Sequence, residues 1–295
     1  MVITGFSGFV GQNLILYLQK YHIQKLSLRY QINQTIVIEN TNNIIHLAGK
    51  AHDLKKVSQP QDYYDANFEL TKQLYDAFLK SDAKKFIFMS SVKSSADNVA
   101  GVLTEDTILN PQTHYGKFKL MAQEYIQVQP LSEGKSFYIL RPFMIHGPGN
   151  KGNLNLLYQF VKKGIPYPLA AFENQRSFLS IENLCFVIKE ILENEIPSGV
   201  YQVADDESLS NNDLVKEIAL NLGLKSKLLN VPARFIQLVA KLGDKFKLPL
   251  NTERLNKLTE NYIVSNKKIK TALGKELPIK ARDGLKRTIL SFKVN

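Results

Sequence analysis

Thr4-Gly5-Phe6-Ser7-Gly8-Phe9-Val10-Gly11 stands between a short apolar strand, Met1–Thr4, and a helix predicted over Phe9–Lys20. Gly5 permits a tight turn, Gly8 lets the backbone approach a pyrophosphate, and Gly11 allows the helix to pack closely. The N-terminus of the helix can then receive the phosphates. This stretch therefore predicts a phosphate loop for a dinucleotide, formed by Gly5, Ser7, Gly8, Phe9, Val10 and Gly11.

Downstream, apolar strands alternate with helices. Strands are expected at Lys25–Leu28, Thr35–Ile38, Ile44–Leu47, Lys84–Met89, Phe137–Leu140 and Val200–Ala204, and helices at Pro60–Lys80, around Tyr115, and at Glu182–Asn194. This alternation predicts an α/β fold with a doubly wound, Rossmann-like parallel sheet. We expect a dinucleotide-binding domain at residues 1–150, with residues of about 181–205 returning to it. Residues 151–295 should form mainly a smaller mixed α/β substrate lobe, whose residues beyond 210 form several amphipathic helices.

The region between residues 30 and 44 is shorter than a doubly wound fold normally requires. Thr35–Ile38 is expected to be a third strand, yet Ile44–Leu47 already has the pattern of the fourth, which leaves no room for a helix between them. The end of the second strand is where a dinucleotide enzyme selects its cofactor. Arg29 lies there without an acid, which favours NADP over NAD, and Glu39 is a candidate for the missing acidic residue.

Composition indicates an ordinary globular protein. Of the 295 residues, 44% are hydrophobic and 22% are charged. We find no apolar run of about 18 residues and no signal-peptide pattern. The single cysteine, Cys185, excludes an internal disulfide and lies in an apolar helical pattern, so it is expected in the core. We expect a cytoplasmic protein without an integral membrane segment.

The net charge of +11 is distributed along the chain, which argues against a nucleic-acid partner and suits dianionic ligands. The densest basic stretch runs from Val231 to Lys247, with apolar residues at helical spacing. Two interpretations stay open for it: a lobe helix packed on its neighbours, or a peripheral membrane contact. Five scattered histidines without ligand spacing predict no metal site.

A second motif, Tyr115-Gly116-Lys117-Phe118-Lys119, sets a tyrosine one helical turn ahead of a lysine. An ammonium beside a phenol stabilises the phenolate and lowers its pKa from near 10, so the pair can make a base. Upstream, the predicted strand Lys84–Met89 ends in Ser90-Ser91, at the edge where parallel sheets place their chemistry. We assign proton transfer to Tyr115, its electrostatic support to Lys119, and the hold on the reacting oxygen to Ser91. Ser90 is interpreted as structural.

The phosphate loop, serine, tyrosine and lysine in this order resemble the extended short-chain dehydrogenase/reductase family, particularly its nucleotide-sugar 4-epimerases and 4-keto-reductases. The resemblance covers nearly the whole chain and implies NAD or NADP as cofactor and a UDP-sugar as substrate. On the cofactor side it implies further contacts from Leu47, Ala48, Gly49, Asn67, Tyr115, Lys119 and Pro142. On the substrate side it adds Asn153 and Arg176 to Ser91. His46, next to Leu47, is interpreted as a packed strand residue.

Several residues depart from the family's pattern. Val92 and Lys93 occupy the places of an acid pair in the related 4,6-dehydratases, so we do not expect dehydration. Met144 replaces an asparagine common in UDP-galactose epimerases, and Ser177 replaces a frequent aspartate. The identity of the sugar therefore stays open.

Three functions follow from this sequence. The first is 4-epimerisation of a UDP-hexose or UDP-N-acetylhexosamine, ranked narrowly ahead on the overall pattern. The second is NADPH-dependent reduction of a UDP-4-keto-6-deoxy sugar, which Arg29 and Met144 favour. The third is a non-catalytic dinucleotide sensor or structural subunit, against which the intact Ser91, Tyr115 and Lys119 argue. A homodimer is the candidate assembly.

Overall fold

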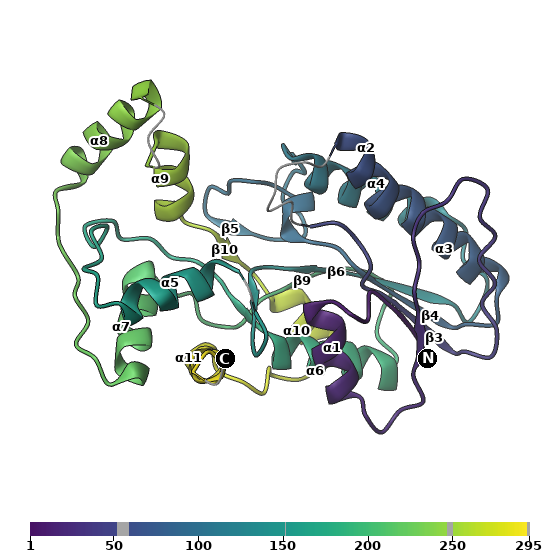
Figure 1. Ribbon diagram of the computed structural model, residues 1–295. Coiled ribbons are helices and arrows are strands. Elements are labelled where there is room, and N and C mark those ends of the chain that lie inside the picture. The colour runs from purple at the N-terminus through teal and green to yellow at the C-terminus, as the bar shows by residue number, and fades with distance from the viewer. Residues whose placement is uncertain (52–58, 151, 247–249, 294–295) are drawn as a thin grey trace.

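In the computed structural model, which describes residues 1–51, 59–150, 152–246 and 250–293, a six-stranded parallel sheet lies between two layers of helices (Figure 1). The strand order is β2-β1-β3-β4-β6-β9, and every neighbouring pair is parallel. The strands are β1 (Val2–Thr4), β2 (Gln24–Leu26), β3 (Asn43–His46), β4 (Lys85–Met89), β6 (Ser136–Pro142) and β9 (Gly199–Val203). The predicted α/β, doubly wound class is confirmed.

Side chains alternate between the two faces of the sheet, so each face has its own core. One face packs against α1 (Phe9–Tyr17) and α6 (Ile181–Glu193), where Leu14 and Ile188 meet Ile3 and Ile87. The other face packs against α3 (Leu70–Lys80) and α4 (His114–Val128) through apolar and aromatic side chains that include Tyr75, Phe78, Phe86, Phe88 and Ile126. Because both faces of the sheet are buried, its central strands contain continuous runs of apolar residues.

The predicted third strand at Thr35–Ile38 is wrong. The chain is irregular there, and Asn33 and Asn40 take left-handed backbone conformations with φ of 60° and 53°. The physical reason is length: a parallel strand needs a crossover of about a dozen residues, and residues 27–34 are too few. Ile38 is nevertheless buried, packed in the core on the α3 side of the sheet.

The helix predicted over Pro60–Lys80 is continuous but changes its pitch. An α-helical turn, α2 (Pro60–Tyr64), leads into a π-helical segment, η1 (Asp65–Glu69), before α3 begins at Leu70. π-Helical turns often occur at functional sites. This one carries the buried Asn67.

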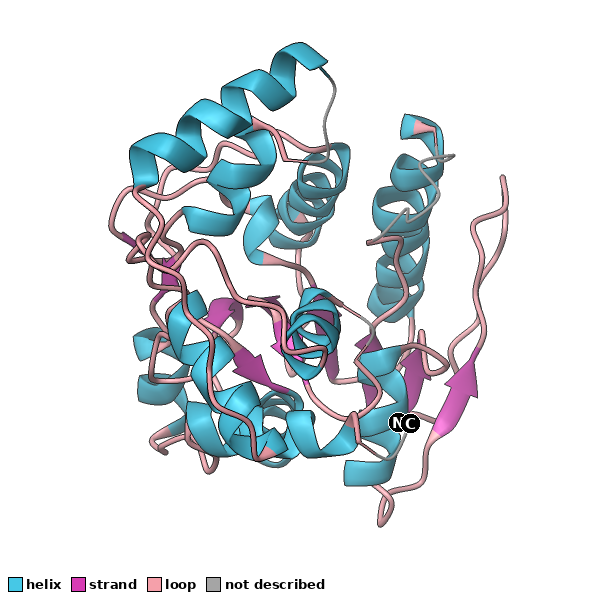
Figure 2. Cartoon of the chain, turned by 60° about the vertical axis from the view of Figure 1, so that its left-hand side comes forward, coloured by secondary structure: helices cyan, strands magenta, loops and turns pink. Residues whose placement is uncertain are grey.

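A lobe of helices and short strands covers one end of the sheet (Figure 2). Its helices are α5 (Asn153–Lys162), α7 (Asn211–Leu222), α8 (Ala233–Phe246), α9 (Thr252–Thr259) and α11 (Ala281–Ser291), which share one apolar core. The remaining elements are the 3₁₀ turn η2 (Val92–Ser94), α10 (Lys267–Leu273), and two small sheets that pair β5 (Val102–Leu103) with β10 (Ile263–Val264) and β7 (Ile145–His146) with β8 (Leu179–Ser180). None of the helices in the described ranges is long and apolar enough to cross a bilayer.

A buried carboxylate joins the lobe to the sheet domain. Asp205, which is 3% exposed, follows β9 and accepts hydrogen bonds from the Ser180 backbone N–H at 3.0 and 3.1 Å and from Asn183 Nδ2 at 2.7 Å. Its Oδ2 also lies 3.8 Å from Nε2 of His146, whose Nδ1 is 2.9 Å from the Thr288 hydroxyl on α11. Four segments distant in sequence therefore meet at one carboxylate.

We predict that Asp205→Ala lowers the free energy of unfolding by about 2–4 kcal/mol, because it leaves buried donors without an acceptor. Urea denaturation followed by circular dichroism measures this loss. Glu207→Ala, which removes an exposed carboxylate two residues away, is the matched control and should change stability by less than about 0.5 kcal/mol. Equal stabilities of the two variants would contradict the structural role of Asp205.

Candidate active site

The glycine turn sits where the strand order of the sheet reverses. The chain moves outward from β1 to β2 and then returns to β3 on the other side of β1, and the gap between the carboxyl ends of β1 and β3 is where such sheets bind ligands. Gly5 has a φ of +65°, and a Cβ there would lie 2.6 Å from the Ala48 backbone N. A Cβ on Gly11 would lie 2.5 Å from the Gly5 carbonyl oxygen. These close approaches explain why both positions are occupied by glycine.

The opening of helix α1 suits a phosphate group. Gly8 is its N-cap residue, without a side-chain cap, and both Ser7 and Gly8 are exposed. A Cβ on Gly8 would meet only the Gly5 carbonyl oxygen, at 3.3 Å. Helix N-terminal N–H groups therefore face an open, glycine-lined turn, which fits the diphosphate of a dinucleotide.

A series of buried, hydrogen-bonded polar side chains lies behind this turn, and we did not predict it from the sequence. His46 is fully buried, with Nδ1 2.7 Å from the Thr4 hydroxyl and Nε2 3.0 Å from the Thr71 hydroxyl. The Thr4 hydroxyl also accepts from the Ala48 N–H at 3.3 Å. Burial, with a smaller contribution from the charge of Lys119, lowers the pKa of His46 to about 3. His46 is thus a neutral packing residue, which confirms its interpretation from the sequence.

Asn67 holds the segment that follows β3. Its Oδ1 accepts from the Lys50 N–H at 3.1 Å, and its Nδ2 donates to the Lys50 carbonyl at 3.0 Å. A Cβ on Gly49 would lie 2.7 Å from Asn67 Oδ1 and 3.1 Å from Lys119 Nζ. Asn67 and Lys119 therefore converge beside Gly49, at the carboxyl edge of the sheet.

Ser91, Tyr115 and Lys119 come together at the end of β4. The buried Lys119 ammonium donates to the Met89 carbonyl at 2.9 Å, two residues before Ser91. Tyr115, one turn earlier on α4, is hydrogen-bonded to Ser91. The sequence spacing therefore translates into one cluster in which a phenol, a hydroxyl and an amine meet.

Gly116 lets α4 approach this strand end closely. A Cβ on Gly116 would lie 2.3 Å from the Lys93 carbonyl oxygen, so no larger residue fits without movement of the backbone. Thr113 caps the helix by accepting from the Gly116 N–H at 3.2 Å. Asp97 Oδ2 accepts from the N–H groups of Gln112 and Thr113 at 2.7 and 3.3 Å. Helix and strand end are therefore fixed relative to each other on both sides of Tyr115.

The electrostatics of the cluster correct one expectation. Burial raises the pKa of Tyr115 to about 12, and its hydrogen bond with Ser91 opposes that rise. Burial lowers the pKa of Lys119 to about 7. We expected Lys119 to lower the pKa of the tyrosine; instead, desolvation acts on both groups and the opposing hydrogen bond comes from Ser91.

A second buried network supports the serine segment. Gln123 Nε2 donates to the hydroxyl of Ser90 and, at 2.5 Å, to that of Ser94, which in turn donates to the Ser91 carbonyl at 2.6 Å. Gln123 Oε1 accepts from Nε and Nη2 of the buried Arg141 at 2.9 and 2.6 Å. The structural interpretation of Ser90 is confirmed. The sequence held a signal for Gln123, because it continues the four-residue spacing from Tyr115 through Lys119.

The other predicted cofactor residues are distributed more widely. Pro142 is buried at the carboxyl end of β6, beside the same sheet edge. Arg29 and Glu39 are exposed on the irregular segment after β2. The single Cys185 is buried and reduced in the core, where burial raises the pKa of its thiol to about 12, which confirms its expected place.

Of the two predicted substrate residues, Arg176 has the surroundings that better suit a contact with a ligand. Its Nη1 donates to the Lys257 carbonyl of α9 at 3.0 Å, and its Nε is buried without a hydrogen-bond partner among the described residues. Burial lowers the pKa of its guanidinium. Asn153 is exposed at the first position of α5.

Tyr262 connects Arg176 with the serine segment. Its backbone pairs with that of Arg176, and its carbonyl accepts from the Ser177 N–H at 2.9 Å. Its buried hydroxyl donates to the Ala96 carbonyl at 2.7 Å, and its ring stacks on Phe143 with centroids 4.4 Å apart. One side chain thus joins the lobe to the segment after Ser91, and no pattern in the sequence predicts this contact.

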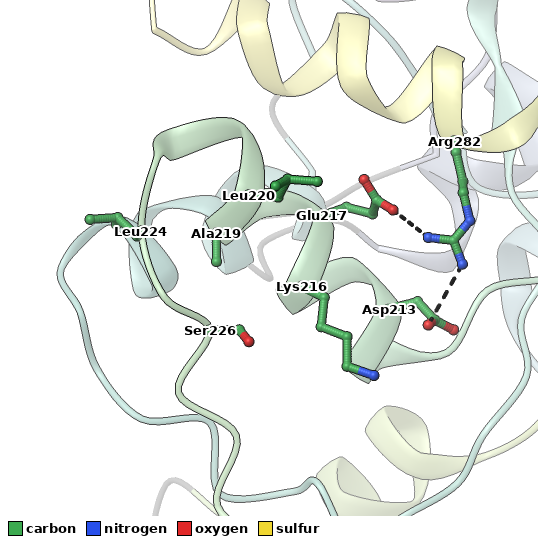
Figure 3. Close-up of a pocket in the computed structure, with 8 residues that line it drawn as sticks. All are labelled: Asp213, Lys216, Glu217, Ala219, Leu220, Leu224, Ser226 and Arg282. Carbon is green, nitrogen blue, oxygen red and sulfur yellow. Dashed lines mark hydrogen bonds and ion pairs between the residues drawn. The ribbon is translucent and has the colours of Figure 1, made fainter.

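A hollow of about 490 Å³ on the lobe lies apart from this cluster (Figure 3). It is bordered by α7 and α11, and Arg282 there pairs with Glu217 and lies 3.8 Å from Asp213. The side chains that line the hollow therefore belong to a network of ion pairs that joins α11 to α7. Among the described residues, no three His, Cys, Asp or Glu side chains gather to hold a metal ion.

Residues 1–204 match the NAD dependent epimerase/dehydratase family. The chain belongs to that family. Over 318 residues it is 29% identical to a UDP-glucose 4-epimerase of Vibrio cholerae, a match that covers 99% of this chain and 95% of the relative. Over 252 residues it is 28% identical to the N-acetyl-alpha-D-glucosaminyl-diphospho-ditrans,octacis-undecaprenol 4-epimerase of Escherichia coli O157:H7, covering 79% of this chain and 75% of the relative.

Among solved structures, the UDP-glucuronic acid 4-epimerase from Bacillus cereus in complex with NAD shares the fold of this family member. The TM-score is 0.76 at 19% sequence identity, over 99% of this chain and 98% of that one. Family membership makes the chain an enzyme of the extended short-chain dehydrogenase/reductase type that uses a nicotinamide dinucleotide. The glycine turn and the cluster at Tyr115 lie within the matched residues.

The buried Lys119 generates a prediction about pH and stability in this family member. Its pKa is about 7 in the folded protein and about 10.4 in an unfolded chain, so the unfolded state binds more protons between these values. The folded protein should therefore gain about 3 kcal/mol, relative to Lys119→Met, as the pH rises from 7 to 10. Urea denaturation of the nucleotide-free proteins at both pH values measures this change.

Lys117→Met, which removes an exposed lysine from the same helix, is the control for that measurement. Its stability should follow the wild type at both pH values. Parallel stability curves for wild type and Lys119→Met would show that the Lys119 ammonium is solvated, contrary to the structure.

Proposed function

We propose that this enzyme is a 4-epimerase of a UDP-hexose or a UDP-N-acetylhexosamine. The observation that carries the proposal is the convergence of Ser91, Tyr115 and Lys119 at the sheet edge beside the glycine turn. A phenol that is hydrogen-bonded to a second hydroxyl offers two contacts for one reacting oxygen. Arg176, in the lobe linked to this cluster by Tyr262, offers a cation for a diphosphate.

In this proposal Tyr115 removes the proton from the 4-hydroxyl of the sugar and later returns it. A bound nicotinamide would supply the hydride chemistry: it would accept a hydride from C4 and, after the 4-keto sugar has turned over, return it to the other face of the sugar ring. Ser91 hydrogen-bonds the same oxygen and keeps it in line with Tyr115. Lys119 holds positive charge beside Gly49, where a nicotinamide ribose would lie. Gly5, Gly8 and the start of α1 would hold the diphosphate of the dinucleotide.

The substrate diphosphate is assigned to Arg176. Its unpartnered, buried Nε and the partly desolvated guanidinium can donate to phosphate oxygens in a bidentate manner. The named substrates of the two relatives, UDP-glucose and a diphospho-undecaprenol-linked sugar, share a sugar on a diphosphate. Assays should therefore offer this enzyme both carriers.

The second candidate is the NADPH-dependent reductase of a UDP-4-keto-6-deoxy sugar. It is favoured by Arg29, an exposed cation three residues after β2, with no acid on that strand. Met144 also favours it, because it replaces an asparagine that is common in UDP-galactose epimerases; its φ of 38° is a conformation that asparagine adopts more readily than methionine. The non-catalytic alternative is not retained, because membership of the NAD dependent epimerase/dehydratase family makes the chain an enzyme.

An assay without added cofactor separates the two candidates. We predict that purified protein retains NAD and interconverts a UDP-hexose or UDP-N-acetylhexosamine with its C4 epimer, because an epimerase regenerates its cofactor in every turnover. Chromatography of the sugars measures conversion, and Tyr115→Phe should reduce kcat by about a hundredfold or more. Tyr17→Phe, on α1, is the control.

Stoichiometric consumption of NADPH by a UDP-4-keto sugar, without epimerisation, would instead identify the reductase. Arg29→Ala should then weaken NADPH binding about ten- to a hundredfold and leave NADH binding unchanged.

Arg176→Ala should weaken UDP binding by about ten- to a hundredfold, since it removes a charge-assisted contact worth about 1.5–3 kcal/mol. Isothermal titration calorimetry with UDP measures the effect. NAD affinity should not change, which distinguishes a lost ligand contact from a disturbed fold. Arg287→Ala removes a half-exposed arginine that pairs with Glu182 and serves as the control. An unchanged UDP affinity in Arg176→Ala would remove Arg176 from the site.

A further inference from the structure

Helix α8 exposes a row of large apolar side chains. Phe235, Leu238, Leu242 and Phe246 are separated by three, four and four residues, so they line one face of the helix. Their exposed fractions are 57%, 55%, 47% and 64%. The row extends for about 16 Å along the helix axis. Such a continuous exposed apolar row differs from the scattered apolar residues of an ordinary surface.

The orientation of the row is fixed, because another face of α8 is buried. Ile236, Ala240 and Gly243 form that face and pack on the lobe core. A Cβ on Gly243 would lie 1.8 Å from the Leu250 carbonyl oxygen, so the helix lies directly against the segment that leads into α9. The packed-helix interpretation of this stretch is therefore correct for one face only. In both views α8 lies at the outer end of the lobe (Figures 1 and 2).

A row of cations borders the apolar row. Arg234, Lys241 and Lys245 follow one another at seven and four residues, are all exposed, and lie on the side away from the buried face. Asp244 is the single acid of α8, and it accepts hydrogen bonds from Thr252 on α9. The helix therefore presents adjacent apolar and basic rows to its surroundings. Lys247, which the basic stretch of the sequence includes, lies outside the described residues.

We propose that this face of α8 docks on an anionic lipid surface. An interfacial helix lies in the membrane plane with its apolar side chains about 5–10 Å deep and its cations among the headgroups, which is the arrangement of these two rows. A second copy of the chain fits less well, because pairing two such faces would bring Arg234, Lys241 and Lys245 close to like charges. The net charge of +11 adds a long-range attraction to an anionic surface.

Docking through α8 has a consequence for the candidate active site. The Gly243–Leu250 contact joins α8 to the segment before α9, and the Lys257 carbonyl of α9 accepts the hydrogen bond from Arg176. The lipid-binding face is thus one helix away from the side chain proposed to bind the substrate diphosphate. Membrane docking would hold that end of the lobe at the bilayer surface.

Fluorescence provides a direct test, because the chain contains no tryptophan. A single reporter in Leu238→Trp should shift to shorter wavelength when vesicles of phosphatidylcholine and phosphatidylglycerol in a 3:1 ratio are added. Pure phosphatidylcholine vesicles should shift it much less, and added salt should reverse the effect. Val128→Trp places the reporter at an exposed position at the end of α4, and should not respond.

Co-sedimentation with the same vesicles tests the two rows separately. Vesicle binding should fall at least tenfold when serine replaces Phe235, Leu238 and Leu242. It should also fall at least tenfold when glutamine replaces Arg234, Lys241 and Lys245. The control is serine at the exposed Val128, Leu220 and Leu224. Circular dichroism verifies that each variant is folded.

Wild-type binding that is equal for neutral and anionic vesicles, or that survives both triple substitutions, would overturn the proposal. A wild-type dimer that the apolar substitution converts into a monomer, without vesicle binding by either, would show that the row contacts a second copy. Turnover of a soluble UDP-sugar should be the same in the variants and the wild type. Absence of turnover in all of them would count against the proposed function and leave the vesicle result intact.

Discussion

The hydrogen bond from the buried Lys119 ammonium to the Met89 carbonyl joins helix α4 to the end of strand β4, and the geometry of the candidate site depends on it. It fixes Tyr115, one turn away, against Ser91. The contact requires the close approach that Gly116 permits. An ammonium in this position is desolvated, which lowers its pKa to about 7, so the protein keeps the group at a cost in stability. Such a cost is typical of functional sites.

Buried polar groups around this contact are arranged in two networks. One runs from the Ala48 backbone through Thr4 and His46 to Thr71 and supports the glycine turn and the segment after β3. The other runs from Arg141 through Gln123 to the serines after β4. Because the hydroxyls, the imidazole and the amide of these networks are hydrogen-bonded to one another, the networks fix the backbone at the sheet edge. Arg176 Nε, which lies in the lobe, is one of several buried atoms without a hydrogen-bond partner among the described residues, and a ligand can satisfy it.

The two ends of the lobe differ: one is joined to the sheet by buried contacts, and the other is exposed. Toward the sheet it is joined by specific buried contacts, Tyr262 to Ala96 and Asp205 to Ser180. Away from the sheet it ends in α8, whose apolar and basic rows are exposed. The buried contacts attach the lobe to the sheet, and the exposed amphipathic helix at its outer end is the basis of the proposed docking on a lipid surface. The family relationship establishes the oxidoreductase chemistry, whereas the docking proposed for α8 concerns where that chemistry takes place.

The sequence by itself determined the parallel α/β sheet, the glycine turn, and the grouping of Tyr115 with Lys119, because these depend on local spacing and on strand-helix alternation. It failed at Thr35–Ile38, where apolar residues resemble a strand but the preceding connection is too short for a parallel crossover. Only the tertiary structure decided that desolvation, and not Lys119, governs the pKa of Tyr115, since burial is a property of packing. It also decided that Tyr262 reaches the serine segment and that one face of α8 stays exposed, because both facts depend on which elements meet across long separations in sequence.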